Sequence, residues 1–237
     1  MHGLFGSIDF FHPEEHFDNI IVHCPDMAGY GSERDANTAD LTLTDQAKSV
    51  VTLMYEIDEP VWLLGHSVGG AVAVRAANLA PEMVLGVISV EGNFTLNDAF
   101  WCKTVSETNP DAWEAEFAEM QIDLGAWLTS NGIGVTEQRL RWAQAIFDYQ
   151  PATTVQAVAK AVINETGQPT YLEQVRSVIE RPTPFALLAG EHSASGWDVP
   201  DWVRAAASTD QIQVSAGHLM MLENPTQFAK HVMNAMS

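Results

Sequence analysis

Short apolar runs alternate with amphipathic segments along much of the chain. Five runs have the length and composition of buried strands and cover residues 19–23, 61–64, 85–90, 185–188 and 211–214. Apolar positions recur at helical spacing over 47–54, where Thr44 is a suitable N-cap. A glycine-rich helix is expected after Gly65, and a last helix over 226–236. This alternation predicts an α/β fold with a mostly parallel sheet and helices on both faces.

The alternation stops between residues 94 and 182, where one helical pattern follows another. Asn109 and Pro110 form an expected cap and first turn. Four apolar stripes at helical spacing cover residues 113–127, 140–147, 155–162 and 172–179. Four of the seven tryptophans also fall in this stretch: Trp101, Trp113, Trp127 and Trp142. We therefore expect residues 94–182 to form a helical lid inserted into a core of 1–93 and 183–237, with an apolar cleft beneath the lid.

Composition restricts the class of ligand. The 237 residues suit one domain, and no apolar stretch approaches the roughly 18 residues of a membrane-spanning helix. The chain carries 31 Asp and Glu against 11 Lys and Arg, a formal charge of −20. Nucleic acid is not expected as a partner because phosphate binding needs a basic face, and anionic membranes or substrates would be repelled. The expected ligand is a neutral small molecule, and the sequence leaves the oligomeric state open.

Cysteine content and charge bear on the compartment. Cys24 and Cys102 are the two cysteines, so no disulfide framework is specified and a reducing, cytoplasmic location is expected. The excess of carboxylates over lysines fits an acidic cytosolic protein, and it also fits adaptation to high salt, where counterions screen self-repulsion.

A serine follows one of the predicted strands. The pentapeptide G-H-S-V-G at 65–69 comes directly after the run at 61–64 and opens the glycine-rich helix. Its glycines let the backbone make a tight strand-to-helix turn without a Cβ clash, and the turn holds the Ser67 hydroxyl at the positive end of the helix. Because a serine hydroxyl is a weak nucleophile until a base takes its proton, Ser67 as nucleophile requires a histidine.

His218 is the predicted base. It follows the last predicted strand, in a loop that returns to the carboxyl edge of the sheet, and Gly217 precedes it. None of the other seven histidines follows a late strand with a glycine before it in this way.

Three motifs in this order resemble the α/β-hydrolase superfamily, and most closely its small lidded serine esterases. They are H-G-L-F-G at 2–6 as the oxyanion loop, the pentapeptide at 65–69 as the nucleophile elbow, and Gly217-His218 with Glu223 and Pro225 as the base loop. The resemblance covers essentially the whole chain. It implies that the backbone N–H groups of Leu4 and Val68 hold the oxyanion, and that no cofactor is needed.

The acid of the expected triad departs from the family pattern. The usual position, three residues after the glycine that ends the penultimate strand, holds Ser193. A carboxylate is still needed to fix the histidine tautomer and to stabilise the imidazolium. Glu91 follows the run at 85–90 and is the first substitute, because the superfamily places its acid after that strand in some lipases and dehalogenases. Asp198 and Glu191 are alternatives, as is the absence of any acid.

One further motif matches a metal pattern. Residues 12–16 spell H-x-x-E-H, but Pro13 lets the two histidines share a helix face only if a helix begins there. No other motif supplies a third ligand, so we expect an exposed polar turn here and no metal site.

The first residues carry an unusual feature. In the resembled fold the His-Gly pair ends a central strand that lies between the runs at 19–23 and 61–64. Here Met1 stands where that strand would finish, and its absence would leave two sheet edges unpaired. We therefore expect the sequence to be an N-terminally truncated form of a longer chain.

The predicted function is that of a serine hydrolase that cleaves a neutral, hydrophobic carboxylic ester or lactone through an acyl-enzyme. Carbon–carbon bond hydrolysis and acyl transfer use the same serine and are alternatives. A non-catalytic ligand-binding protein of the same fold is a further alternative, which Ser193 in the acid position favours.

Overall fold

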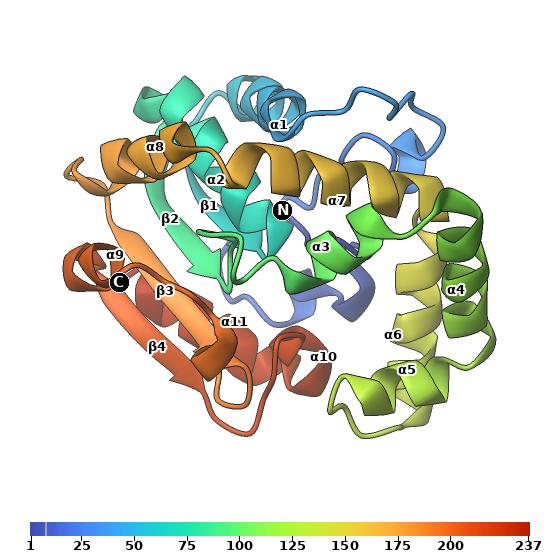
Figure 1. The fold of residues 1–237 in the computed structure, drawn as a ribbon. Helices are drawn as coiled ribbons and strands as arrows, with labels where there is room; N and C mark the ends of the chain where they lie inside the picture. The colour runs from blue at the N-terminus through green and yellow to red at the C-terminus, as the bar shows by residue number, and fades with distance from the viewer. Residues whose placement is uncertain (8) are drawn as a thin grey trace.

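A parallel sheet of four strands, in the order β1-β2-β3-β4, forms the centre of the computed structural model, which describes residues 1–7 and 9–237 (Figure 1). The strands are β1 (Val61–His66), β2 (Val84–Val90), β3 (Phe185–Gly190) and β4 (Thr209–Gln213). Every neighbouring pair is parallel. The predicted strands at 61–64, 85–90, 185–188 and 211–214 are confirmed, although the last begins two residues earlier than predicted.

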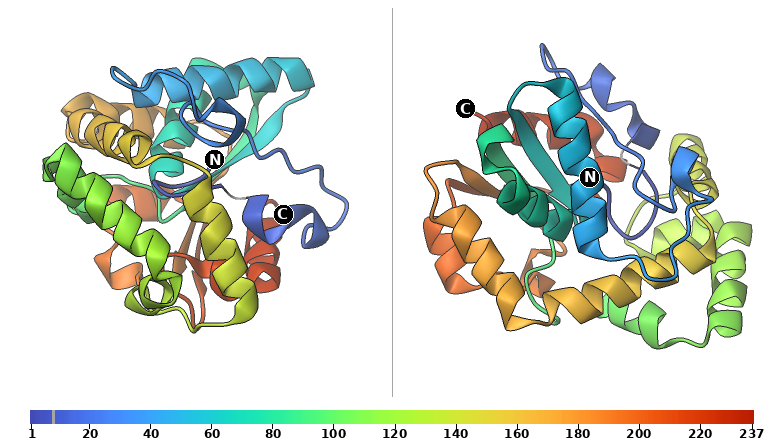
Figure 2. Two further views of the ribbon diagram at one scale, coloured as in Figure 1. Left: turned by 90° about the vertical axis from the view of Figure 1, so that its right-hand side faces the viewer. Right: turned by 90° about the horizontal axis from the view of Figure 1, so that it is seen from above.

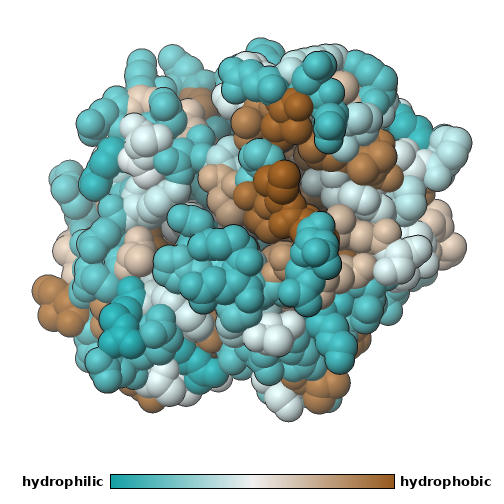
Figure 3. All heavy atoms as spheres, turned by 180° about the vertical axis from the view of Figure 1, so that it is seen from behind, coloured by the Kyte–Doolittle hydropathy of each residue, from teal (hydrophilic) through white to brown (hydrophobic). Residues whose placement is uncertain are grey.

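The predicted strand at 19–23 is wrong, because these residues do not join the sheet. Met1 bonds the outer edge of β1 instead: its amine donates to the Leu64 carbonyl at 2.6 Å, and its carbonyl accepts from the His66 N–H at 3.1 Å. An apolar groove of about 540 Å³ lies between β1 and residues 19–25. The run therefore has no strand beside it to bond, and Ile21 is 84% exposed. Apolar side chains gather around a hollow on the face seen from behind (Figure 3).

Helices cover both faces of the sheet (Figure 2). On one face α2 (Val68–Leu79) packs on β1 and β2, flanked by α1 (Leu43–Ile57) and α8 (Pro169–Ile179). On the other face α11 (Pro225–Ala235) packs on β3 and β4. The expectation of an α/β fold is thus confirmed, and so are the helices expected over 47–54, after Gly65 and over 226–236.

The N-cap of α1 differs from the prediction. The side chain of Thr42, not that of Thr44, accepts the Asp45 N–H at 3.0 Å, so the helix begins one residue before Thr44. The Thr42 hydroxyl also donates to the Asp45 carboxylate at 2.6 Å. Thr42 and Asp45 satisfy each other across the first turn, which makes Thr42 the better cap.

Helices fill the chain between β2 and β3. They are α8 together with α3 (Phe100–Glu107), α4 (Pro110–Ile122), α5 (Leu124–Ser130), α6 (Glu137–Asp148) and α7 (Ala152–Thr166). The apolar stripe at 113–127 is divided between α4 and α5, because the Asp123 side chain accepts the Ala126 N–H at 2.9 Å and starts a new helix. Figure 1 shows α3 to α6 beside the sheet, whereas α8 packs on α2.

The remaining elements are short. They are α9 (Asp201–Ala206) and α10 (Met220–Glu223), with 3₁₀ turns at Asp9–Phe11, Pro13–Glu15, Gly31–Glu33, Pro81–Met83 and Ala194–Gly196. Among the helices of residues 1–7 and 9–237, none has the length and apolar character needed to span a bilayer.

A buried ion pair joins the sheet-covering layer to the inserted helices. Arg75 of α2 and Glu165 of α7 lie 3.0 Å apart, with side chains 9% and 19% exposed. Glu165 also accepts the Leu43 N–H at the start of α1, at 2.6 Å. One carboxylate therefore connects three helices, and its removal leaves a buried guanidinium without its charge partner.

We expect Glu165→Ala to lower the free energy of unfolding by about 2–4 kcal/mol in urea titrations. Glu180→Ala is the control, because the Arg176–Glu180 pair is more than half exposed on both sides. The control should cost less than about 1 kcal/mol. Equal losses for the two variants would contradict a structural role for the buried pair.

A second carboxylate lies where the chain leaves β2 for the inserted helices. Asp98 accepts the Phe94 N–H at 2.9 Å and an Asn93 amide N–H at 3.1 Å. Burial raises the pKa of Asp98 to about 6. A carboxyl group with a higher pKa in the folded state binds its proton more readily when folded, so the free energy of unfolding falls as pH rises from about 4 to about 6.

Ionisation of Asp98 should cost the unmodified protein about 2–3 kcal/mol of unfolding free energy between pH 4 and pH 7. We expect Asp98→Asn to avoid this loss, because the amide does not ionise. The measurement is the urea midpoint at several pH values. Asp40→Asn, at an exposed position, should keep the original pH dependence. Parallel curves for the parent and Asp98→Asn would contradict the prediction.

Candidate active site

Ser67 occupies a strained turn between β1 and α2. Its φ of 53° and ψ of −122° lie outside the regions that side-chain-bearing residues usually adopt. A Cβ on Gly65 would overlap the Gly69 carbonyl, which explains why the elbow needs glycine there. The Ser67 N–H donates to the Val90 carbonyl at the end of β2, at 2.9 Å. The turn is thus held against the neighbouring strand end.

The loop at residues 2–6 lies directly against this turn. A Cβ built on Gly3 would come within 3.1 Å of the Ser67 Cβ. The buried Tyr30 hydroxyl donates to the Leu4 carbonyl at 2.9 Å and anchors the loop. The N–H of Val68, in the first position of α2, has no acceptor within its helix. Within the described part of the chain, neither this N–H nor that of Leu4 donates to a protein atom.

His218 lies in a loop between β4 and α10. The Gly217 N–H donates to the Glu223 carboxylate at 2.6 Å, which fixes the loop just before the histidine. The Nδ1 of His218 lies 2.6 Å from the Glu91 Oε2, and its side chain is 43% exposed. Nδ1 therefore carries the proton toward the carboxylate, which leaves Nε2 as the acceptor nitrogen of the ring.

Glu91 is a buried carboxylate at the end of β2. Its Oε1 accepts the Gly190 N–H at 2.8 Å and the Ser193 hydroxyl at 2.5 Å. Burial alone would raise the pKa of Glu91. The hydrogen bond and the electrostatic attraction of His218, and then the hydrogen bonds from Ser193 and Gly190, outweigh burial and lower the pKa below its ordinary value. Glu91 is therefore ionised at neutral pH.

The other two carboxylates considered from the sequence lie elsewhere. Asp198 accepts bonds from Thr95 and Asn97 at 2.6 Å and 2.9 Å, and Glu191 accepts the Ser215 N–H at 2.8 Å. Neither bonds His218. Of the three candidates, the structure brings Glu91 to the histidine, and Ser193 helps to hold it there.

His66 is a second histidine of the site that the sequence analysis did not single out. Its side chain is buried, and Nε2 donates to the His218 carbonyl at 2.9 Å. Burial, reinforced by the charge of His218, lowers the pKa of His66. A neutral ring thus connects the elbow to the base loop. Its place just before Ser67 was visible in the sequence, but the nearness of the His218 carbonyl was not.

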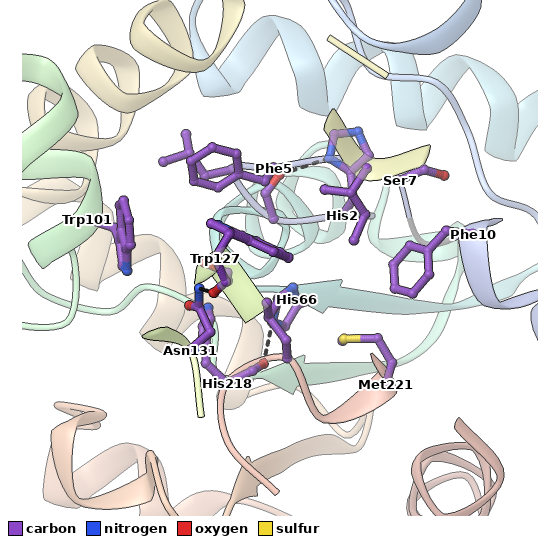
Figure 4. A pocket seen from close by; sticks show the side chains of 15 residues that line it. His2, Phe5, Ser7, Phe10, His66, Trp101, Trp127, Asn131, His218 and Met221 are labelled. Atoms are coloured by element: carbon purple, nitrogen blue, oxygen red, sulfur yellow. Dashed lines mark hydrogen bonds between the residues drawn. The ribbon is translucent and has the colours of Figure 1, made fainter. Parts of the chain in front are cut away.

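A cavity of about 60 Å³ lies above Ser67, and Ser67, His218 and Leu4 all line it. Figure 4 shows Phe5, Trp101 and Trp127 around the same space as His66 and His218. Between Ser67 and the His218 ring there is no hydrogen bond in the described residues, an arrangement common before substrate binds.

The possible metal motif at 12–16 forms a short turn. His12 has a left-handed φ of 54°, and residues 13–15 make one 3₁₀ turn, so the two histidines do not lie on one α-helix. Across residues 1–7 and 9–237, no three His, Cys, Asp or Glu side chains gather in a way that could hold a metal ion.

Two known proteins are similar in sequence to parts of this chain. The mouse protein phosphatase methylesterase 1 is 42% identical over 72 residues, which are 28% of this chain and 18% of that protein. Lipase LipV of Mycobacterium tuberculosis is 28% identical over 115 residues, which are 47% of this chain and 43% of that protein. The chain thus matches less than half the length of either relative. Both names denote hydrolytic enzymes.

Solved structures show the same fold. MenH from S. aureus superposes with a TM-score of 0.75, at 15% identity, over 99% of this chain and 90% of that one. The model of the alpha/beta hydrolase family matches residues 1–231. The elbow at Ser67, the helix-covered parallel sheet and the family match agree, and the chain belongs to the alpha/beta hydrolase family.

Proposed function

We propose that the protein is a serine hydrolase that cleaves a neutral, hydrophobic carboxylic ester or lactone. The observation that carries this proposal is the 2.6 Å contact between the Glu91 carboxylate and His218 Nδ1, beside a serine in a strained elbow. That arrangement holds an imidazole in the tautomer able to accept a proton at Nε2.

In the acylation step, the Ser67 oxygen attacks the carbonyl carbon while His218 takes the serine proton at Nε2. The N–H groups of Leu4 and Val68 stabilise the negative oxygen that develops, and ionised Glu91 stabilises the imidazolium. When the intermediate collapses, the bond from carbon to the alcohol oxygen breaks. The alcohol leaves with the proton from His218, and the acyl group stays on Ser67.

In the second step, water releases the acyl group. His218 takes a proton from the water, whose oxygen bonds to the acyl carbon, and then returns that proton to Ser67 as the carboxylic acid leaves. For a lactone, the alcohol and the acid are two ends of one product. Donation by neutral His66 to the His218 carbonyl keeps the base loop in place through both steps.

The chemistry of the cavity supports a neutral substrate. Its lining is mostly apolar, with Phe5, Trp101, Trp127 and Met221 among the residues that contribute. The formal charge of −20 disfavours the approach of anions. An uncharged ester or lactone satisfies both conditions.

The first prediction concerns the nucleophile. We expect a fluorophosphonate probe to add once to the protein by mass spectrometry and to fail on Ser67→Ala, because the alanine has no hydroxyl to attack phosphorus. Ser49→Ala, at an exposed position of α1, should label normally. Binding of an ester-like ligand without any labelling would instead favour the non-catalytic alternative.

The second prediction concerns the acid. Glu91→Gln should lower kcat by about 10³–10⁴-fold, because a neutral amide neither stabilises the imidazolium nor fixes the tautomer. Glu191→Gln is the matched control, since the Glu191 carboxylate accepts the Ser215 backbone N–H and makes no bond to His218 among the described residues, so kcat should stay within a few-fold. The measurement is hydrolysis of nitrophenyl esters by variants of unchanged melting temperature. A Glu91→Gln variant within a few-fold of the parent would remove this assignment.

A further inference from the structure

The cavity above Ser67 is small for an enzyme that cleaves long-chain esters. Its volume is about 60 Å³. An apolar cavity of about 150 Å³ holds one benzene ring, so this cavity has room for a group of only a few carbon atoms. A longer chain has to displace the walls, and whether they yield depends on how they are packed.

The wall contributed by α5 is held from behind. Trp127 is only 6% exposed although it lines the cavity. Its ring meets that of Phe147 edge-on at 5.1 Å, and Phe147 is fully buried against Phe117 at 5.3 Å. Interiors of this kind are close-packed, so the indole cannot move aside without a rearrangement of the aromatic side chains behind it.

A second part of the wall belongs to the loop proposed to hold the oxyanion. Phe5 follows Leu4 directly and packs edge-on against Trp101 at 5.8 Å. It also stacks parallel to Phe117 at 6.4 Å. A substrate group that pushed Phe5 aside would also move the Leu4 N–H. Widening the cavity on this side would therefore weaken the stabilisation of the transition state.

From this packing we propose that the substrate group held against Trp127 is short, with no more than about four carbon atoms, and that Trp127 sets this limit. The inference rests on the proposed function and adds a substrate class to it: small esters or lactones. Long-chain lipids do not fit this class.

The experiment uses two series of esters with the unmodified protein. In the first, nitrophenyl esters lengthen the acyl group from acetate to octanoate. In the second, acetate esters lengthen the alcohol from methyl to octyl. We expect kcat/KM to fall at least tenfold beyond four carbons in the series whose variable group lies against Trp127. Similar kcat/KM values across both series, or a preference for eight carbons, would overturn the inference.

Variants test whether Trp127 sets the limit. Trp127→Leu should raise the kcat/KM ratio of the eight-carbon to the two-carbon substrate at least tenfold, in the series that shows the limit. Trp202→Leu is the control, because Trp202 packs against the Arg176 side chain and does not line the cavity. Its ratio should stay that of the parent. An unchanged ratio in folded Trp127→Leu would overturn the role of Trp127.

Trp127→Phe keeps the proposal testable if Trp127→Leu does not fold, since it retains an aromatic ring against Phe147 while removing volume from the cavity wall. It should shift the ratio in the same direction, and no shift would overturn the proposed limit. Labelling of Ser67 by fluorophosphonates distinguishes failure of the short-chain limit from failure of the proposed function. Labelling combined with a long-chain preference overturns the short-chain inference alone. No labelling and no hydrolysis of any ester overturn the proposed function and the inference with it.

Discussion

The site depends on a carboxylate that several parts of the chain hold in place. Glu91 ends β2 with a φ of 44°, a backbone conformation that costs energy for a residue with a side chain. Bonds from Gly190, Ser193 and His218 compensate for its burial and keep it charged. Because these partners come from β3, the loop after it and the loop after β4, the bond to His218 exists only when the sheet is assembled.

The two strained residues of the site are neighbours across the sheet. Ser67 follows β1, Glu91 follows β2, and the Ser67 N–H donates to the carbonyl of Val90. In parallel sheets the carboxyl ends of adjacent strands lie at one edge, so both side chains emerge there. The inserted helices then cover this edge with aromatic rings, which limit the volume above the serine.

Charge and packing have separate roles. The formal charge of −20 acts at a distance and repels anions, whereas the buried groups near Ser67 act by contact. His66 illustrates the second role. Its lowered pKa keeps the ring neutral, so it can donate to the His218 carbonyl without placing a second positive charge beside the imidazolium.

The sequence by itself determined the elements that form through interactions between residues close together in the chain. Four strands, the helix after Gly65 and the turn at Ser67 follow from apolar runs and from glycines that prevent a Cβ clash, and these need no distant partner. The cap of α1 was misplaced by two residues, because two threonines offered similar local chemistry and the bond to Asp45 favoured Thr42.

Tertiary structure decided what depends on distant partners. The apolar run at 19–23 reads as a strand, but a strand needs a neighbour to bond, and a groove separates this run from β1. Three carboxylates could have served His218, and only the paths of the loops after β2 and β3 brought Glu91 to it while Asp198 and Glu191 bonded other groups. The size of the cavity was likewise beyond the sequence, because it is set by how rings from separate helices pack against one another.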